Sequence, residues 1–323
     1  MSLPDAVVAI AAAQDGLVTR AQLRQHGVTR AAMRWHLGRD WALVLPTVVS
    51  LRRQRLSTGQ RWVAALLEAG PDAVLSGEHA CAWHGWRSAR TDGPVDVLVP
   101  MDQSARSLGF IRVHRTRRIE ATPVRRPGLV IASRVRAVTD AARWTRHENA
   151  QLALVLEAVQ RELVTVEQLE HEVEAGPTRG SAPARAAIRA ARQGVWSAPE
   201  HALMRLCSTS RTLPAAWPNP QLTAHDGSGL LSPDLWFDDV GLAVMVHSRT
   251  HHARDAEWET TVARDGELAA HGIVVLAFTP SAIAREPDHV LRRVEQAHTT
   301  AGTGGRRRPP VVMTPRGWGL MTA

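Results

Sequence analysis

Near position 240, the 323-residue chain contains a stretch whose residue types could act on a phosphodiester bond. Residues 230–247 predict a strand, a tight turn at 238–241 and a second strand, and the acid Asp234 stands out in the otherwise apolar first arm. Strand side chains alternate faces, so positions 245 and 247 should project to the same side, about 6.6 Å apart, and towards Asp234. A metal-dependent phosphodiesterase builds its centre from a hairpin with an acid on one arm and an acid and a base, two residues apart, on the other. Here those two positions are Met245 and His247.

This substitution decides the chemistry that we expect. Mg²⁺ requires hard oxygen ligands in octahedral geometry, and the thioether of Met245 cannot supply one. Without the ion, nothing would activate water or neutralise the phosphate in the transition state. The chain also contains no lysine that could substitute for the cation. We therefore expect a hairpin that binds its partner without cleaving it and without a cofactor.

Two active alternatives stay open. Asp234 and Glu200, an acid in the first turn of a preceding helix, could hold a weakened Mg²⁺ or Mn²⁺ with His247 as general base. Alternatively His247, His251 and His252 could bind a transition metal together with Asp234 or Asp255, because imidazole and carboxylate suit Zn or Mn. The same histidines could equally serve as polar packing or as phosphate contacts.

The elements around this hairpin define a C-terminal module at 196–299. We expect a helix capped by Ser197, the two strands of the hairpin, a helix at 255–268, a buried strand at 273–278 and a basic helix at 287–298. Residues 300–323 are rich in Gly, Pro and Arg and predict a flexible basic tail.

The module also carries a resemblance. The order of its elements and the motifs Ser197-Ala-Pro-Glu200, Pro233-Asp234 and Val275-Leu-Ala-Phe-Thr-Pro280 resemble an endonuclease-like domain of unknown function, related to very-short-patch-repair enzymes in the PD-(D/E)xK superfamily. The resemblance implies a restriction-endonuclease-like α/β fold and assigns Glu200, Asp234 and His247 to the catalytic positions. Because Met245 replaces the family's central acid, it implies a degenerate centre.

The first 55 residues predict three short helices followed by a two-stranded ribbon. Thr19 caps the second helix and Thr29 the third, in which Met33 faces inward and leaves Arg30 and Arg34 outward. This is the order of a winged helix-turn-helix, whose third helix enters the major groove while the ribbon follows the DNA backbone. The alternative is a small helical domain with a solvated arginine face. The candidate DNA contacts here are Arg30, Arg34, Arg39, Arg52 and Arg53.

A second resemblance spans this segment and the next. Asp15-Gly-Leu-Val-Thr-Arg-Ala-Gln-Leu23, then Gly27-Val-Thr29, and Ser76-Gly-Glu-His-Ala-Cys-Ala-Trp-His-Gly85 resemble the AbiEi-type antitoxins of type IV toxin-antitoxin systems in their actinobacterial form. The family usually has Pro-Gly-Val at the ribbon turn, where this chain has Pro46-Thr47-Val48. The resemblance implies a DNA-binding antitoxin with a cognate toxin as a possible protein partner.

Residues 56–175 predict a mixed α/β middle domain without a catalytic constellation. Its group of His79, Cys81 and His84 matches no standard zinc spacing, so packing is the favoured interpretation over a metal site. Residues 176–195 predict a linker followed by a basic helix with Arg185, Arg189 and Arg192 on one face, which would be either a solvated stripe or a set of phosphate contacts.

Composition bounds these interpretations. The formal net charge of +8 fits an anionic partner, most often nucleic acid, although scattered arginine clusters could produce it without function. Two distant cysteines argue against a disulfide framework, and no segment predicts a signal peptide or a membrane span, so we expect a cytoplasmic protein. The sequence thus predicts an α+β multidomain DNA-binding regulator or antitoxin-like repressor, with a metal-dependent DNA endonuclease of repair or phage defence as the alternative.

Overall fold

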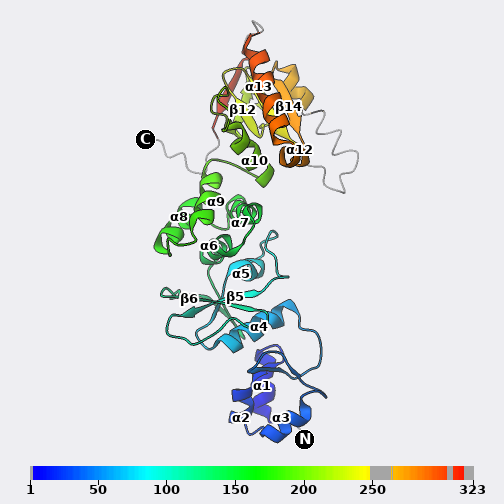
Figure 1. The fold of residues 1–323 in the computed structure, drawn as a ribbon, viewed down its shortest axis with the longest axis vertical. Coiled ribbons are helices and arrows are strands. Elements are labelled where there is room, and N and C mark those ends of the chain that lie inside the picture. Colours follow the sequence, from blue (N-terminus) through cyan, green and yellow to red (C-terminus); the bar gives the residue numbers. More distant parts are fainter. Residues whose placement is uncertain (1–2, 248–262, 264, 304–307, 316–323) are drawn as a thin grey trace. The chain divides into compact units, whose positions relative to one another are not determined.

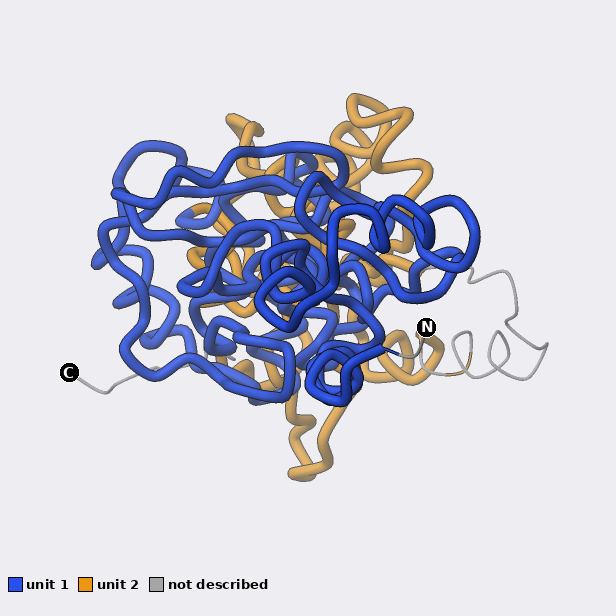
Figure 2. Tube along the Cα trace, turned by 90° about the horizontal axis from the view of Figure 1, so that it is seen from below, with its two compact units in different colours: residues 1–185 blue, residues 186–323 orange. Residues whose placement is uncertain are grey.

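The chain is an α+β protein with several sheets that divides into two compact units, residues 1–185 and residues 186–323 (Figure 2). The structure, a computed structural model, describes residues 3–247, 263, 265–303 and 308–315 (Figure 1). The predicted N-terminal and middle domains both fall in the first unit. In the part of the chain that the structure describes, no helix combines the length and the apolar character that crossing a membrane requires.

The first unit begins with a small helical layer. Its elements are α1 (Asp5–Ala13), β1 (Leu17–Thr19), α2 (Arg20–Gln25), α3 (Arg30–His36), β2 (Ala42–Leu43) and β3 (Val48–Ser50). The three strands pair antiparallel in the order β1-β3-β2. The predicted caps are confirmed: the side chain of Thr19 accepts from the amide of Gln22 in a capping box, and that of Thr29 accepts from the amide of Ala32.

The rest of the first unit is a mixed five-stranded sheet with helices. The sheet has the order β6-β5-β4-β8-β7, and β5 and β6 are parallel. Strand β5, next to the central strand β4, is buried over Val95–Val99 because α4 and α5 pack on it, and it includes one buried polar residue, Asp96. The strands are β4 (Val74–Leu75), β5 (Val95–Pro100), β6 (Ile111–Thr116), β7 (Val124–Arg126) and β8 (Leu129–Ile131). The helices are α4 (Thr58–Ala69), α5 (Gly77–Trp83), α6 (Arg134–Trp144), α7 (Glu148–Gln160) and α8 (Val166–Ala175).

The second unit is built around a four-stranded sheet with the order β14-β13-β12-β9. Helices α10, α12 and α13 pack against one face of it, and a three-stranded sheet with the order β11-β10-β15 covers the other. The helices are α9 (Ala182–Arg192), which runs across the boundary between the units, α10 (Ala198–Cys207), α12 (Pro280–Arg285) and α13 (Pro287–Thr303). The strands are β9 (Trp217–Pro218), β10 (Gln221–Ala224), β11 (Gly229–Leu230), β12 (Leu235–Phe237), β13 (Leu242–Val246), β14 (Val274–Phe278) and β15 (Val311–Thr314).

Two sequence predictions for this unit need correction. The first arm of the predicted hairpin is two strands: β11 belongs to the smaller sheet and β12 to the larger, because the chain changes sheets at Ser232 and Pro233. The predicted flexible tail is also wrong at its start, since α13 continues to Thr303 and β15 pairs antiparallel with β10. Most of the helix predicted at 255–268 lies outside the described residues.

Candidate functional site

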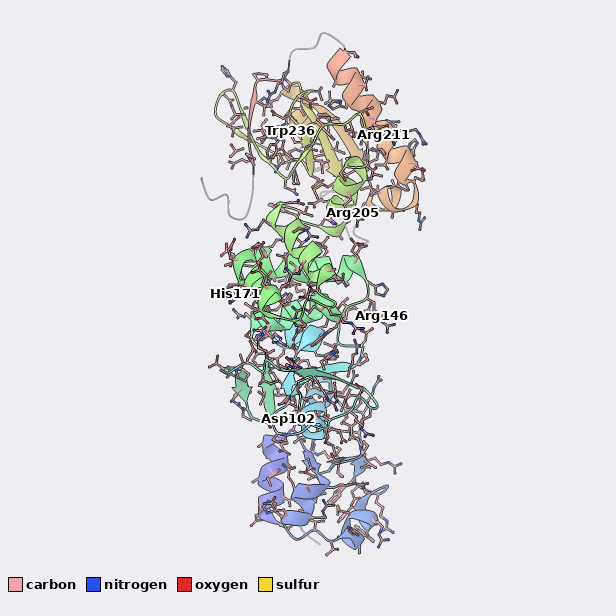
Figure 3. The ribbon with its side chains drawn as sticks, turned by 60° about the vertical axis from the view of Figure 1, so that its left-hand side comes forward. Asp102, Arg146, His171, Arg205, Arg211 and Trp236 are labelled. Atoms are coloured by element: carbon pink, nitrogen blue, oxygen red, sulfur yellow. The ribbon has the colours of Figure 1, made fainter. Side chains whose placement is uncertain are left out.

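The hairpin of β12 and β13 brings its polar positions together as the spacing predicts. Leu235 pairs with Val244, so the next residue back, Asp234, stands opposite Met245. Trp236, labelled in Figure 3, shares an apolar cluster with Met245. Because side chains alternate along strands, Asp234, Met245 and His247 belong to this same face, which the smaller sheet covers.

Met245 is part of the core. It is only 5% exposed and packs with Leu222, Trp236 and Leu268. The position that would carry the central acid of a metal centre is therefore an apolar contact between two sheets. A carboxylate in the same place would require a bound cation or a proton.

Asp234 is the acid of this face whose pKa departs most from its ordinary value. Its Oδ2 accepts a hydrogen bond of 2.5 Å from the amide of Val246. Burial raises the pKa of Asp234 to about 7, helped by the neighbouring charge of Glu200 and opposed by the Val246 amide and by His247. The carboxyl of Asp234 therefore exchanges its proton near neutral pH.

Glu200 holds the start of α10. Its Oε1 accepts a hydrogen bond of 2.7 Å from Ser197 Oγ, and its Oε2 accepts from the amide of Trp196 at 3.0 Å and from Asn219 Nδ2 at 2.8 Å. The side chain of Asn219 also donates to the carbonyl of Gly194, and this residue is 3% exposed with a φ of 45°. Both carboxylate oxygens of Glu200 thus accept hydrogen bonds from the protein itself.

His247 is paired with an acid that sequence reasoning missed. Its Nε2 lies 2.7 Å from Oδ2 of Asp265, and Oδ1 of Asp265 is buried without a hydrogen-bond partner among the described residues. Asp265 lies in the helix that precedes β14, and only its place in a predicted helix facing the hairpin could have suggested it. The other candidate metal ligands, His251, His252 and Asp255, lie outside the described residues. Within the described ranges, no three side chains of His, Cys, Asp or Glu form a group that could hold a metal ion.

A second candidate surface lies on α3 in the first unit. Arg30 and Arg34 are both exposed, as the inward position of Met33 predicts. Between them and the end of the helix, Trp35 is 56% exposed, and the guanidinium of Arg39 lies 4.5 Å from the centre of its ring. Sequence reasoning did not single out Trp35, although a tryptophan beside Arg34 on a polar helix face was a visible signal.

The β2–β3 ribbon that follows α3 is held by hydrogen bonds at its turn and after its second strand. At its turn, Glu68 of α4 accepts hydrogen bonds from the amide of Thr47 at 2.9 Å and from its hydroxyl at 2.7 Å. After β3, Arg53 donates to the carbonyl of Gly38, while Arg52 is exposed. Of the two ribbon arginines predicted to contact DNA, one therefore supports the loop after α3.

The arginines of α9 do not share one environment. Arg185 donates to Ser181 Oγ at 3.2 Å, Arg189 is exposed, and Arg192 lines a cavity of about 690 Å³ in the second unit. The opposite side of the helix is apolar and buried at Ala187 and Ile188.

His79, Cys81 and His84 point to different partners. Nδ1 of His79 accepts from Trp62 Nε1 at 2.8 Å, and Nε2 of His84 donates to the carbonyl of Ala132 at 2.8 Å. Cys81 is fully buried, which raises the pKa of its thiol well above the ordinary value. These contacts are those of packing residues.

Comparisons with known proteins add little to this geometry. No protein-family model and no curated protein matches the chain. Among solved structures, the crystal structure of the RV2827C protein from Mycobacterium tuberculosis is similar at 17% sequence identity and a TM-score of 0.37, over 58% of this chain and 78% of that chain. A likeness of this size carries no argument about fold or function.

Proposed function

We propose that residues 1–55 are a winged helix-turn-helix that binds double-stranded DNA through α3, and that the protein is a transcriptional regulator or antitoxin-like repressor. The observation that carries the proposal is the order α1, β1, α2, α3, β2, β3 with an antiparallel sheet ordered β1-β3-β2. In winged-helix proteins this arrangement presents the third helix to the major groove.

The exposed side of α3 has the chemistry that such a helix needs. Arg30 and Arg34 can contact guanine edges or phosphates with bidentate hydrogen bonds. Trp35 with Arg39 over its ring offers an apolar surface and a cation beside them, suited to a thymine methyl group or a sugar. Because Glu68 occupies the turn of the ribbon at Thr47, we assign the main DNA contact to α3 rather than to the ribbon turn.

We propose that the C-terminal module is a nuclease-like fold that binds without cleaving, either to DNA or to a protein partner such as a toxin. Support comes from Met245, which is buried among apolar side chains, and from Glu200, whose two oxygens cap α10. A Mg²⁺ centre would require a carboxylate at the position of Met245, and it would require the carboxylate oxygens of Glu200 to bind the ion instead of capping the helix.

The DNA proposal is tested with Arg34→Gln and Trp35→Ala in the full-length protein. We expect each to weaken binding to a duplex by about 5-fold to 10-fold, because each removes a contact worth about 1 kcal/mol or more. Fluorescence anisotropy with a labelled duplex measures the affinity. The matched control is Arg106→Gln, which removes an exposed arginine of the same unit outside α3. Equal affinities in all these proteins, or no binding at low salt, would refute the assignment.

A metal-dependent endonuclease is the second candidate. One observation favours it: Asp234 and Glu200 lie close enough for the charge of Glu200 to raise the pKa of Asp234, as two acids that share a cation do when the cation is absent. Incubation with supercoiled plasmid and Mg²⁺, Mn²⁺ or Zn²⁺ separates the candidates. Cleavage that disappears in Asp234→Ala would establish the enzyme and overturn the non-cleaving module.

A further inference from the structure

The exposed side of α13 carries a row of polar and basic side chains that the proposed function does not use. The helix runs from Pro287 to Thr303, and its apolar residues Val290 and Val294 pack into the core of the second unit. The side chains that project to solvent from the second turn onward recur every three or four residues, so they form one continuous row on the helix surface. We call this row the α13 stripe; it consists of Arg292, Arg293, Gln296, Thr299, Thr300 and Thr303.

Both acids of α13 lie off this stripe. Asp288 is in the first turn, where the partial positive charge of the helix start stabilises a carboxylate. Glu295 faces the loop that follows α10, because its Oε1 accepts hydrogen bonds from Ser210 Oγ at 2.6 Å and from Thr212 Oγ1 at 3.4 Å. The stripe therefore combines two permanent positive charges with neutral polar groups and includes no negative charge.

The same hydrogen bonds bring a third arginine beside α13. Arg211, labelled in Figure 3, is exposed and lies between Ser210 and Thr212, the two residues that contact the helix. Arg292 precedes Glu295 by three residues, so it starts one turn from the point where this loop meets α13. Two segments that are far apart in the sequence therefore add positive charge to one surface.

The composition of this surface favours the backbone of DNA over a protein partner. Guanidinium groups, hydroxyls and side-chain amides are the groups that contact phosphate oxygens in protein–DNA complexes. A protein interface usually has a large apolar or aromatic anchor near its centre. Among the described residues, the large apolar side chains that are exposed lie elsewhere, and none belongs to α13 or to the loop at 208–212.

We propose that the α13 stripe and Arg211 bind the phosphate backbone of double-stranded DNA. The inference rests on the proposed function, in which the C-terminal module binds DNA or a protein partner, and it names DNA as that partner. Because phosphate contacts carry no sequence information, this surface adds affinity and leaves the choice of sequence to α3. Contacts by Arg211, Arg292 and Arg293 add about −2.7 to the slope of log affinity against log salt concentration.

Anisotropy titrations of the full-length protein at several salt concentrations test this surface. In the double variant Arg292→Gln with Arg293→Gln, we expect the slope to flatten by about 1.8, and to the same extent with two duplexes of unrelated sequence. The charge-matched control is Arg106→Gln with Arg117→Gln, which removes two exposed arginines of the first unit outside α3 and should keep the slope of the unsubstituted protein. Equal slopes in the two double variants would overturn the inference.

An iron–EDTA group attached to one cysteine locates the contact without changing an arginine. Both native cysteines, Cys81 and Cys207, are buried, so a cysteine placed on the surface is the one that reacts. We expect the Gln296→Cys conjugate to cleave an end-labelled duplex in the bound complex and the His225→Cys conjugate to leave it intact. His225 is exposed after β10, in the sheet that covers the opposite face of the large sheet from α13. The inference is wrong if the Gln296→Cys conjugate binds the duplex without cleaving it.

The inference and the proposed function fail under different results. If Arg34→Gln weakens binding while the α13 double variant behaves like its control, DNA binding by α3 stands and the inference about α13 falls. If the unsubstituted protein binds neither duplex at low salt, the proposed function falls and takes the inference with it.

Discussion

At the scale of single residues, the hairpin site is defined by what its carboxylates contact. Glu200 accepts three hydrogen bonds at the start of α10, while Asp234 accepts one from the Val246 amide beside a buried apolar contact at Met245. The Asp234 carboxylate therefore has fewer hydrogen bonds to replace water than the Glu200 carboxylate, and its burial raises its pKa to about 7. The ionised form of Asp234 is consequently a source of instability in the folded protein.

Asp234→Asn should therefore stabilise the second unit at alkaline pH. The folded state holds the proton of Asp234 up to a pKa of about 7, whereas an unfolded aspartate loses it near pH 3.9. Stability from this group is thus greatest below about pH 4, falls as pH rises between the two values, and stays low above pH 7. We expect Asp234→Asn to raise the free energy of unfolding by about 1–2 kcal/mol at pH 8, less than the full shift implies because solvent screens a half-buried group. The gain should vanish near pH 4.

Urea unfolding at several pH values measures this difference, and ¹³C titration of the Asp234 carboxyl measures its pKa directly. Glu200→Gln serves as the companion variant, since removing the neighbouring charge should lower the pKa of Asp234. A carboxyl of Asp234 that titrates near pH 4 would contradict the electrostatic account. A fall of its pKa on addition of Mn²⁺ would instead support the metal-binding alternative.

At the scale of elements, β15 completes the smaller sheet of the second unit. Val311 is 8% exposed and packs in the cluster that contains Met245, whereas its neighbour Val312 is 64% exposed. This alternation follows from the antiparallel pairing of β15 with β10, in which Leu222 pairs with Met313 and Ala224 with Val311.

The two valines give a matched pair of variants. Val311→Ala should lower the free energy of unfolding by about 2 kcal/mol, because it removes buried methyl groups and leaves a cavity. Val312→Ala should change it by less than about 0.5 kcal/mol, since its side chain is in solvent. Chemical denaturation followed by circular dichroism compares them. Equal effects of the two substitutions would show that the segment does not form a strand in solution.

At the scale of the whole molecule, the formal net charge is +8, and every positively charged side chain counted in it is an arginine. Arginine keeps its charge at every accessible pH and binds phosphate through a rigid fork, so DNA affinity should depend strongly on salt and weakly on pH. The exposed Arg30, Arg34 and Arg52 belong to the first unit, and Arg189 belongs to the second.

The salt dependence of DNA binding tests how many of these arginines take part. Three phosphate contacts by Arg30, Arg34 and Arg52 give a slope of about −2.7 in a plot of log affinity against log salt concentration. Arg30→Gln and Arg34→Gln together should flatten the slope by about 1.8, and a full-length slope much steeper than about −3 would indicate that the second unit also binds. Anisotropy titrations over a range of salt concentrations measure it. An unchanged slope in the double variant would mean that α3 does not contact phosphate.

The sequence by itself determined the local features of this protein. Side-chain oxygens at Thr19, Thr29 and Ser197 fix helix starts because each cap forms within three residues, and all three predicted caps are present. The register that places Asp234 opposite Met245 was likewise readable, because strand alternation and a short turn leave few choices.

Only the tertiary structure decided the contacts between distant segments. The pairing of β15 with β10, the Asp265 partner of His247 and the Glu68 contact at Thr47 join residues between 18 and about 90 positions apart. The composition of residues 300–323 did not predict β15, because an edge strand forms through its pairing with the neighbouring strand, here β10, and that partner lies far away in the sequence.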